Sequence, residues 1–247
     1  MVSGSIFTMG TESNLNRDNR VMVTPEMTDP DPDCPLCGHA GSTPYFRDRR
    51  RAYRQCPACA LVFVPARFHL AAADEKALYD LHENAVDDPG YRRFLSRLAE
   101  PMLARLVAPA RGLDFGCGPA PLLAELFREA GHDMAVYDLY YADHPAVLAG
   151  TYDFITSSET IEHLARPGEV FARWLDLLAP GGRLGIMTKR VIGREAFARW
   201  HYRNDPTHIA FFSTATFEFL ARVHGLELEV VGHDVVIFRT SPYETGA

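Results

Sequence analysis

The chain has 247 residues, of which 47% are apolar and 23% charged, and its net charge is −7. This length allows one full α/β domain with a small appendage, and the acidic balance disfavours a surface devoted to nucleic acid. No apolar run approaches the roughly 18–20 residues that span a bilayer and no basic start precedes an apolar stretch, so we expect a cytoplasmic protein without a membrane partner.

Residues 1–30 are polar and show no periodic apolar pattern, which predicts a tail without fixed structure. A second, very short tail is expected at 243–247.

Four of the five cysteines form two Cys-x-x-Cys pairs. Cys34 and Cys37 are separated by 18 residues from Cys56 and Cys59, a spacing typical of a zinc site. Each pair makes a tight turn that directs two thiolates at one tetrahedral Zn²⁺. The sequence therefore predicts a structural zinc ribbon over 31–68. An iron–sulfur centre and a redox pair are the alternatives, and four thiolates without an open position disfavour catalysis.

Five arginines lie between or beside the two cysteine pairs, opposed only by Asp48. They fit either of two interpretations: a docking surface for RNA, a phosphorylated ligand or an acidic protein, or a solvated strand face. They are Arg47, Arg49, Arg50, Arg51 and Arg54.

Residues 69–108 are predicted to be a helical linker or cap. Helical spacing of apolar residues predicts helix over 74–107, with Pro89 in a first turn and Pro101 expected to kink or divide it.

From residue 109 to 242 the pattern alternates strand and helix. It predicts an α/β fold of the Rossmann-like, doubly wound type, with a mainly parallel sheet and a carboxyl-terminal antiparallel hairpin. Strands are expected at 112–115, 134–137, 154–157, 184–188, 226–231 and 235–239, and helices at 120–130, 170–178 and from Ser213 to Gly225.

The first strand of this domain runs into the loop Asp114-Phe115-Gly116-Cys117-Gly118, and Asp138 closes the second strand 20 residues after Gly118. Glycines let the backbone approach a ligand, and a carboxylate at the next strand end can accept hydrogen bonds from both ribose hydroxyls. The loop fits an S-adenosylmethionine site, an NAD site lacking its third glycine, or a structural turn.

The segment Asp-Phe-Gly-Cys-Gly resembles the first motif of class I methyltransferases, and the order of motifs matches over about 111–240. The resemblance implies that Asp114 supports the loop and the methionine end, that Gly116 and Gly118 pass under S-adenosylmethionine, and that Asp138 holds its ribose. The cofactor site that it implies also includes Cys117, Leu139, Ser158 and Glu159. The preceding helical segment commonly covers the cofactor in this class, which makes lid candidates of Tyr79, His82 and Tyr91.

One departure from the class is a shortened segment after the ribose acid. Only 14 residues separate Asp138 from Asp153, where the class usually has a helix and a further strand. The usual adenine-binding acid has no clear counterpart in this segment.

The third strand leads into Glu159-Thr160-Ile161-Glu162-His163. This segment resembles the corresponding motif of ubiquinone-pathway O-methyltransferases and the Glu-x-x-Glu-His of small-RNA 3′-end methyltransferases. The second resemblance implies a divalent cation, Mg²⁺ or similar, held by Glu159, Glu162, His163 and the downstream His208. Alternatives are His163 as a general base without metal, or a structural role for the segment. Trp200, His201 and Tyr202 fit either pocket lining or core packing.

Together these features predict S-adenosylmethionine-dependent methyl transfer to a small or medium-sized acceptor, at oxygen, with Glu162, His163 and His208 as catalytic residues. One alternative is an RNA or protein methyltransferase that docks its substrate on the zinc ribbon and its arginines. The other is a binding module that keeps the cofactor site without turnover.

Overall fold

The computed structural model describes residues 32–81 and 87–242. The two predicted tails, 1–30 and 243–247, and the lid candidate His82 lie outside the described residues. No helix in the described ranges is long and apolar enough to cross a membrane.

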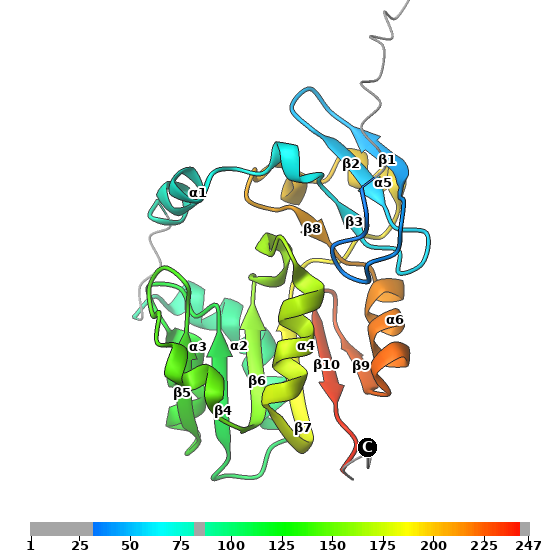
Figure 1. The fold of residues 1–247 in the computed structure, drawn as a ribbon. Helices are drawn as coiled ribbons and strands as arrows, with labels where there is room; N and C mark the ends of the chain where they lie inside the picture. Colours follow the sequence, from blue (N-terminus) through cyan, green and yellow to red (C-terminus); the bar gives the residue numbers. More distant parts are fainter. Residues whose placement is uncertain (1–31, 82–86, 243–247) are drawn as a thin grey trace, which may run out of the picture. The chain divides into compact units, whose positions relative to one another are not determined.

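A six-stranded sheet lies at the centre of the fold, and the predicted fold class is confirmed. Four parallel strands and an antiparallel hairpin lie side by side in the order β5-β4-β6-β7-β10-β9 (Figure 1). Because β4 pairs in parallel with both β5 and β6, the carboxyl ends of these three strands meet at one edge of the sheet. The strands are β4 Arg111–Phe115, β5 Asp133–Tyr137, β6 Tyr152–Ser158, β7 Leu178–Met187, β9 Glu227–Val231 and β10 Val235–Arg239.

Helices cover both faces of this sheet because successive side chains of a buried strand point to opposite faces. In β6, Phe154 belongs to the apolar cluster of α2 and α3, whereas its neighbour Ile155 belongs to the cluster of α4 and α6. The four helices are α2 Pro89–Leu103, α3 Leu122–Glu129, α4 Pro167–Leu177 and α6 Thr214–His224.

The shortened segment after β5 contains only the 3₁₀ helix η2 (Pro145–Ala149) before β6 begins. No strand of the described residues lies beyond β5, which is therefore the edge of the sheet. The helix expected over 74–107 is divided between α1 (Ala72–Tyr79) and α2. Pro101 lies in the last turn of α2 and does not divide it, since the helix continues to Leu103.

A second, four-stranded sheet carries the cysteine pairs. Its order is β1-β2-β3-β8, and its last strand comes from the segment between β7 and α6, far along the chain from the other three. The same segment contributes the short helices α5 and η4, and Phe197 of α5 lies in the small sheet's apolar cluster. The elements are β1 Thr43–Arg47, β2 Ala52–Gln55, β3 Val62–Phe63, β8 Ala210–Phe211, α5 Arg194–Ala198, η4 His201–Asn204 and, after β3, η1 Ala66–Phe68.

Candidate functional site

The glycine loop leaves β4 and passes close to the segment that follows β6. Gly116 and Gly118 have φ angles of 78° and 62°, a region that favours glycine. A Cβ at Gly116 would lie 2.3 Å from Thr160 Oγ1. At Gly118 the described residues place no atom within 4 Å of that position, so a ligand can approach this part of the backbone.

Asp138 directly follows β5, and backbone amides fix its carboxylate. Its Oδ2 accepts a hydrogen bond from the Gly118 N–H at 3.0 Å, and its Oδ1 accepts from the N–H groups of Tyr140 and Tyr141 at 2.8 and 3.1 Å. A carboxylate offers about four acceptor positions, so this arrangement leaves one for a hydroxyl group. The geometry therefore suits the predicted contact with a ribose.

Asp114 is buried in β4, where its Oδ1 accepts a hydrogen bond from Thr156 Oγ1 of β6 at 3.0 Å. Burial raises the pKa of this carboxyl to about 7. Burial also raises the pKa of the Cys117 thiol to about 12, so Cys117 is a neutral packing residue at physiological pH. Of the other predicted cofactor residues, Leu139 is exposed beside Asp138, and Ser158 is half-buried at the end of β6.

Helix α1 contains the lid candidate Tyr79 and contacts the loop after β5. The hydroxyl groups of Tyr79 and Tyr140 donate to the two oxygens of Glu75, at 2.7 and 3.0 Å. The Tyr79 ring also lies edge-on to the His163 ring, with centroids 5.3 Å apart. Tyr79 is thus between the loop of Asp138 and the segment after β6. Tyr91 belongs to α2, and its pKa is raised to about 12 by burial and by the negative charge of Asp114.

The segment after β6 places two carboxyl groups side by side in the interior. Glu162 is fully buried in the 3₁₀ helix η3 (Ile161–His163), and Glu159 precedes it with a φ of 45°. The Tyr202 hydroxyl contacts both groups: it donates to Glu162 Oε1 and lies 3.2 Å from Glu159 Oε2. Burial raises the pKa of Glu159 to about 8, with the charge of Glu162 as a further cause, and raises that of Glu162 to about 7.

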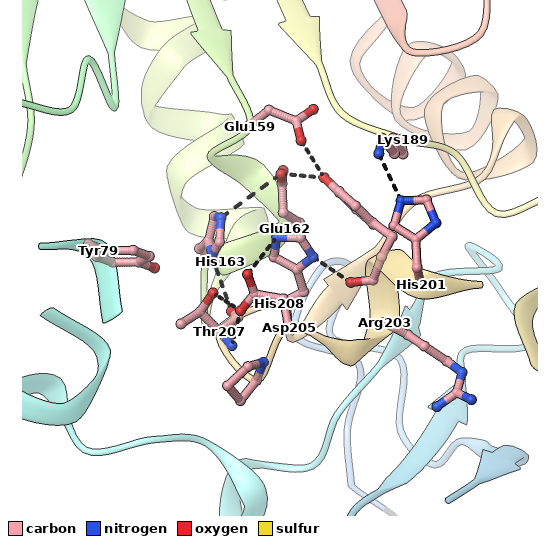
Figure 2. A network of polar contacts seen from close by, with 12 residues as sticks. Tyr79, Glu159, Glu162, His163, Lys189, His201, Arg203, Asp205, Thr207 and His208 are labelled. Carbon is pink, nitrogen blue, oxygen red and sulfur yellow. Dashed lines mark hydrogen bonds and ion pairs between the residues drawn. The ribbon is translucent and has the colours of Figure 1, made fainter. Parts of the chain in front are cut away.

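Two imidazole rings complete this group, as Figure 2 shows. His163 Nδ1 lies 3.2 Å from the Thr207 carbonyl, and His208 Nδ1 lies 2.7 Å from the Tyr202 carbonyl. A carbonyl only accepts, so each Nδ1 carries the proton and each Nε2 carries the lone pair in the neutral ring. Burial, followed by the charge of His163, lowers the pKa of His208 to about 4, so its ring is neutral at pH 7.

The ligand atoms of Glu162, His163 and His208 all lie within 4.8 Å of one another. Glu162 Oε2 is buried and has no hydrogen-bond partner among the described residues. These three residues therefore fit a cation held by one carboxylate and two imidazoles. Glu159, the fourth residue predicted for this site, is outside the group of atoms within 4.8 Å.

A cavity of about 90 Å³ adjoins His163 on the side of the small sheet. Its wall is mostly apolar, with polar groups from His163, Glu75 and Thr207, and is lined by His69, Leu70, Glu75, His163, Ala165, Pro206, Thr207 and Ile209. A small ligand in this cavity would contact the His163 ring.

The four paired cysteines are brought together as predicted. Their Sγ atoms all lie within 4.8 Å of one another, with 3.5 Å between those of Cys34 and Cys59 and 3.6 Å between those of Cys37 and Cys56. These separations are far longer than a disulfide bond and close to the roughly 3.8 Å that tetrahedral Zn²⁺ with ligands at 2.3 Å requires. The arrangement fits a structural zinc ion.

The arginine cluster is not a uniform solvated face. Arg47, Arg49 and Arg50 are exposed, but Arg51 is only 7% exposed and Arg54 donates to Ser42 Oγ at 3.2 Å. Both interpretations of the sequence are wrong for Arg51, because its guanidinium is buried against the backbone carbonyls of the segment 203–206.

Several site residues lack a recognisable sequence signal. Glu75, Thr188 and Asp205 contact the site only because distant segments meet: Thr188 Oγ1 lies 3.3 Å from the Tyr202 hydroxyl, and Asp205 Oδ2 lies 3.9 Å from His208 Nε2. Tyr202 packs in the core, as one of its two interpretations had it, and it is also the hydrogen-bond partner of the two carboxyl groups. Trp200 packs beside the small sheet's apolar cluster, and His201 is exposed.

Residues 88–231, more than half of the chain, match the family model described as "Methyltransferase domain". The ubiquinone biosynthesis O-methyltransferase of Nitrosococcus oceani is 29% identical over 136 residues, covering 51% of this chain and 58% of that protein. The corresponding enzyme of Vibrio parahaemolyticus is 35% identical over 91 residues, covering 37% of this chain and 38% of that protein. The biotin biosynthesis bifunctional protein BioCD of Bordetella avium is 33% identical over 133 residues, covering 44% and 28%. The chain thus spans between about a quarter and three fifths of these relatives.

Two solved structures from Burkholderia thailandensis are also similar. An O-methyltransferase family protein has a TM-score of 0.47 at 18% identity and covers 69% of this chain and 64% of its own. A 1,6-didemethyltoxoflavin-N1-methyltransferase has a TM-score of 0.46 at 20% identity, and the match covers 81% of this chain and 99% of that protein. The family match over 88–231 includes the glycine loop, Asp138 and the Glu159–His163 segment. The chain belongs to the methyltransferase domain family, of the class I S-adenosylmethionine-dependent type.

Proposed function

We propose that this enzyme methylates a hydroxyl oxygen of a small or medium-sized acceptor bound beside His163. The observation that carries the proposal is the group of Glu162, His163 and His208 at the end of β6, next to the cavity that His163 lines. The O-methyltransferases among the relatives support oxygen as the accepting atom.

In the proposed reaction the acceptor oxygen attacks the methyl carbon of S-adenosylmethionine. The O–CH₃ bond forms as the S–CH₃ bond breaks, and the sulfonium becomes the neutral thioether of S-adenosylhomocysteine. The hydroxyl proton passes to His163 Nε2, because the hydrogen bond from Nδ1 to the Thr207 carbonyl keeps the lone pair on Nε2 and stabilises the imidazolium. Orientation of the acceptor against the methyl group supplies much of the remaining rate enhancement.

As an alternative to His163 as the base, we propose that Glu162, His163 and His208 hold a divalent cation, with Glu159 beside it, because one Nε2 lone pair cannot bind an ion and accept a proton together. The partnerless Glu162 Oε2 and the two Nε2 atoms fit this role. Two imidazoles and one carboxylate suit Mn²⁺, Fe²⁺ or Zn²⁺ better than Mg²⁺, which prefers oxygen ligands. When bound, such an ion would lower the pKa of the acceptor hydroxyl and orient it.

Zinc bound by the four cysteines is the third part of the proposal, with a structural role. The cysteines pack in the same apolar cluster as Phe63 and Phe171, so the ion would stabilise the small sheet against the core. In this proposal the ribbon, the helical cap of 69–108 and the methyltransferase domain of 109–242 work as one enzyme. A docking role for the ribbon is not favoured, because Arg51 and Arg54 already bind groups of the protein itself.

The test is transfer of labelled methyl groups from S-adenosylmethionine into a cell extract that is then separated into small molecules, RNA and protein. We expect label in the small-molecule fraction, and a loss of about 100-fold or more for His163→Ala, a typical contribution of a general base. The control His201→Ala, at an exposed histidine, should retain activity. Label in RNA or protein would contradict the proposed acceptor, and full activity of His163→Ala would contradict the proposed base.

The cation is tested separately with a chelator, on enzyme whose zinc content is measured before and after treatment. Activity that falls while zinc is retained, and returns with Mn²⁺ or Fe²⁺, supports the cation. Full activity in the chelator would contradict the proposed cation, and His163 would then act as a general base without a metal ion.

A further inference from the structure

Arg51 is a buried arginine that does not belong to the group of Glu162, His163 and His208 but binds the chain next to it. It lies in the turn between β1 and β2 and is 7% exposed. Its guanidinium donates to the carbonyls of Arg203, Asp205 and Pro206 at 2.6, 2.7 and 3.0 Å. Burial of a charge costs free energy unless hydrogen bonds compensate it, so the folded structure requires these hydrogen bonds to the guanidinium.

The three carbonyls belong to one short segment, and the residues on either side of that segment orient both histidines. The Tyr202 carbonyl accepts from His208 Nδ1, and the Thr207 carbonyl accepts from His163 Nδ1. The segment 203–206 is therefore the part of the chain that sets where both carbonyls lie.

A second contact from the same turn holds the start of this segment. Asp48 Oδ2 accepts from Arg203 Nη1 at 2.7 Å and from the Tyr53 hydroxyl at 3.1 Å. Arg51 Nε in turn donates to the Tyr53 oxygen at 2.9 Å. Arg51 and Asp48 thus bind the backbone and the first side chain of the segment together.

We propose that Arg51 is a positioning residue for methyl transfer, which holds residues 202–208 so that the Thr207 and Tyr202 carbonyls keep the rings of His163 and His208 in place beside Glu162. The inference rests on the proposed function of these histidines. It gives the cysteine-bearing sheet a role in positioning the candidate site, whereas the arginine pattern in the sequence had indicated either docking or a solvated face.

The chemistry explains why the position holds arginine. A guanidinium is planar, stays charged and has five N–H donors, so it can reach three carbonyls and a hydroxyl at once. An ammonium has three donors at one point and cannot span the same acceptors. Misplacement of a catalytic group by about 1 Å can lower a rate by about 100-fold, so a modest shift of the segment is sufficient to affect turnover.

The test compares Arg51→Met and Arg51→Lys with Arg50→Met, a control at an exposed arginine of the same turn. In ¹⁵N NMR spectra of the full-length protein, wild type and the control should show His208 with its proton on Nδ1. We expect Arg51→Met to lose that single tautomer. The amide proton of Ile209, which donates to the Glu162 carbonyl, should also exchange with solvent faster in this variant. Its turnover of the extract acceptor should fall about 10- to 100-fold with unchanged S-adenosylmethionine affinity.

Wild-type ring spectra and amide exchange in Arg51→Met would overturn the positioning role, whatever the activity. If Arg51→Met does not fold, Arg51→Lys is used for the same test. We expect it to show smaller changes in the His208 ring spectrum and in the exchange of the Ile209 amide proton. A third outcome separates the two proposals. If Arg51→Met shows altered ring spectra but the wild type transfers no methyl group to any extract component, the proposed function is contradicted and the positioning of the histidines is supported.

Discussion

The backbone N–H of Ile209 donates a hydrogen bond to the Glu162 carbonyl over 2.9 Å. The carbonyl of the same Ile209 accepts from the N–H of Val64, at 2.8 Å, next to β3 of the cysteine-bearing sheet. One residue thus joins the small sheet to the backbone of Glu162, whose carboxyl group is part of the candidate site, and a disturbance of the small sheet should reach that site.

Removal of zinc should therefore lower both stability and methyl transfer. Structural zinc supplies about 10 kcal/mol of apparent binding free energy in small domains, more than the small sheet can replace by packing. We expect elemental analysis to find one zinc ion per chain fewer in Cys59→Ser than in the wild type. Cys117→Ser, which changes the one cysteine outside the cluster, is the control and should keep its zinc. A zinc-free wild type with an unchanged melting temperature would refute the structural role.

Alanine at the two loop glycines should have unequal effects. Both positions have positive φ, which costs a non-glycine residue about 1–2 kcal/mol. At Gly116 the new Cβ would also meet Thr160 Oγ1 at 2.3 Å, whereas at Gly118 there is open space. Denaturant unfolding should show a larger loss of stability for Gly116→Ala than for Gly118→Ala. Equal losses would mean that the loop does not pack against Thr160 as described.

Asp138→Ala should weaken S-adenosylmethionine binding by about 10- to 100-fold, because a hydrogen bond to a charged group contributes about 1.5–3 kcal/mol. Titration calorimetry gives the change directly. Asp133→Asn, at an exposed position at the opposite end of β5, is the matched control and should bind as the wild type does. Unchanged affinity in Asp138→Ala would exclude this carboxylate from the ribose site.

The buried Asp114 should make stability depend on pH. Burial raises its pKa to about 7 in the folded protein, from about 3.9 when unfolded. Between these values the folded state binds the extra proton, so the free energy of unfolding falls as pH rises, by up to about 1.4 kcal/mol per pH unit. Asp114→Asn should flatten this part of the profile, measured by denaturant unfolding from pH 4 to pH 8. A profile identical to that of the wild type would mean that Asp114 does not titrate in this range.

The sequence predicts the strands of the large sheet because they are apolar runs bounded by helices or turns, although β7 begins at Leu178, six residues before the expected start at 184. That no strand of the described residues lies beyond β5 also follows from the 14 residues between Asp138 and Asp153. Both features depend on local pattern and length, which a single sequence displays.

The construction of the site depends on contacts between distant segments and was only partly predictable. Glu162, His163 and His208 could be named from the resemblance of the Glu159–His163 segment to small-RNA 3′-end methyltransferases, which implies a further downstream histidine. The pairing of β8 with β3 and the burial of Arg51 have no local signature, because each depends on which segments meet in the folded chain.

The central claim is methyl transfer to oxygen beside His163. It is tested most directly by incubating the enzyme with the small-molecule fraction of an extract and S-adenosylmethionine carrying a ¹³C methyl group. The ¹³C chemical shift of the transferred methyl then identifies the atom that received it. We predict an O-methyl signal that is strong for the wild type, absent for His163→Ala and retained for His201→Ala. A signal from an N-methyl or C-methyl group, or an O-methyl signal of equal size in His163→Ala, would contradict the claim.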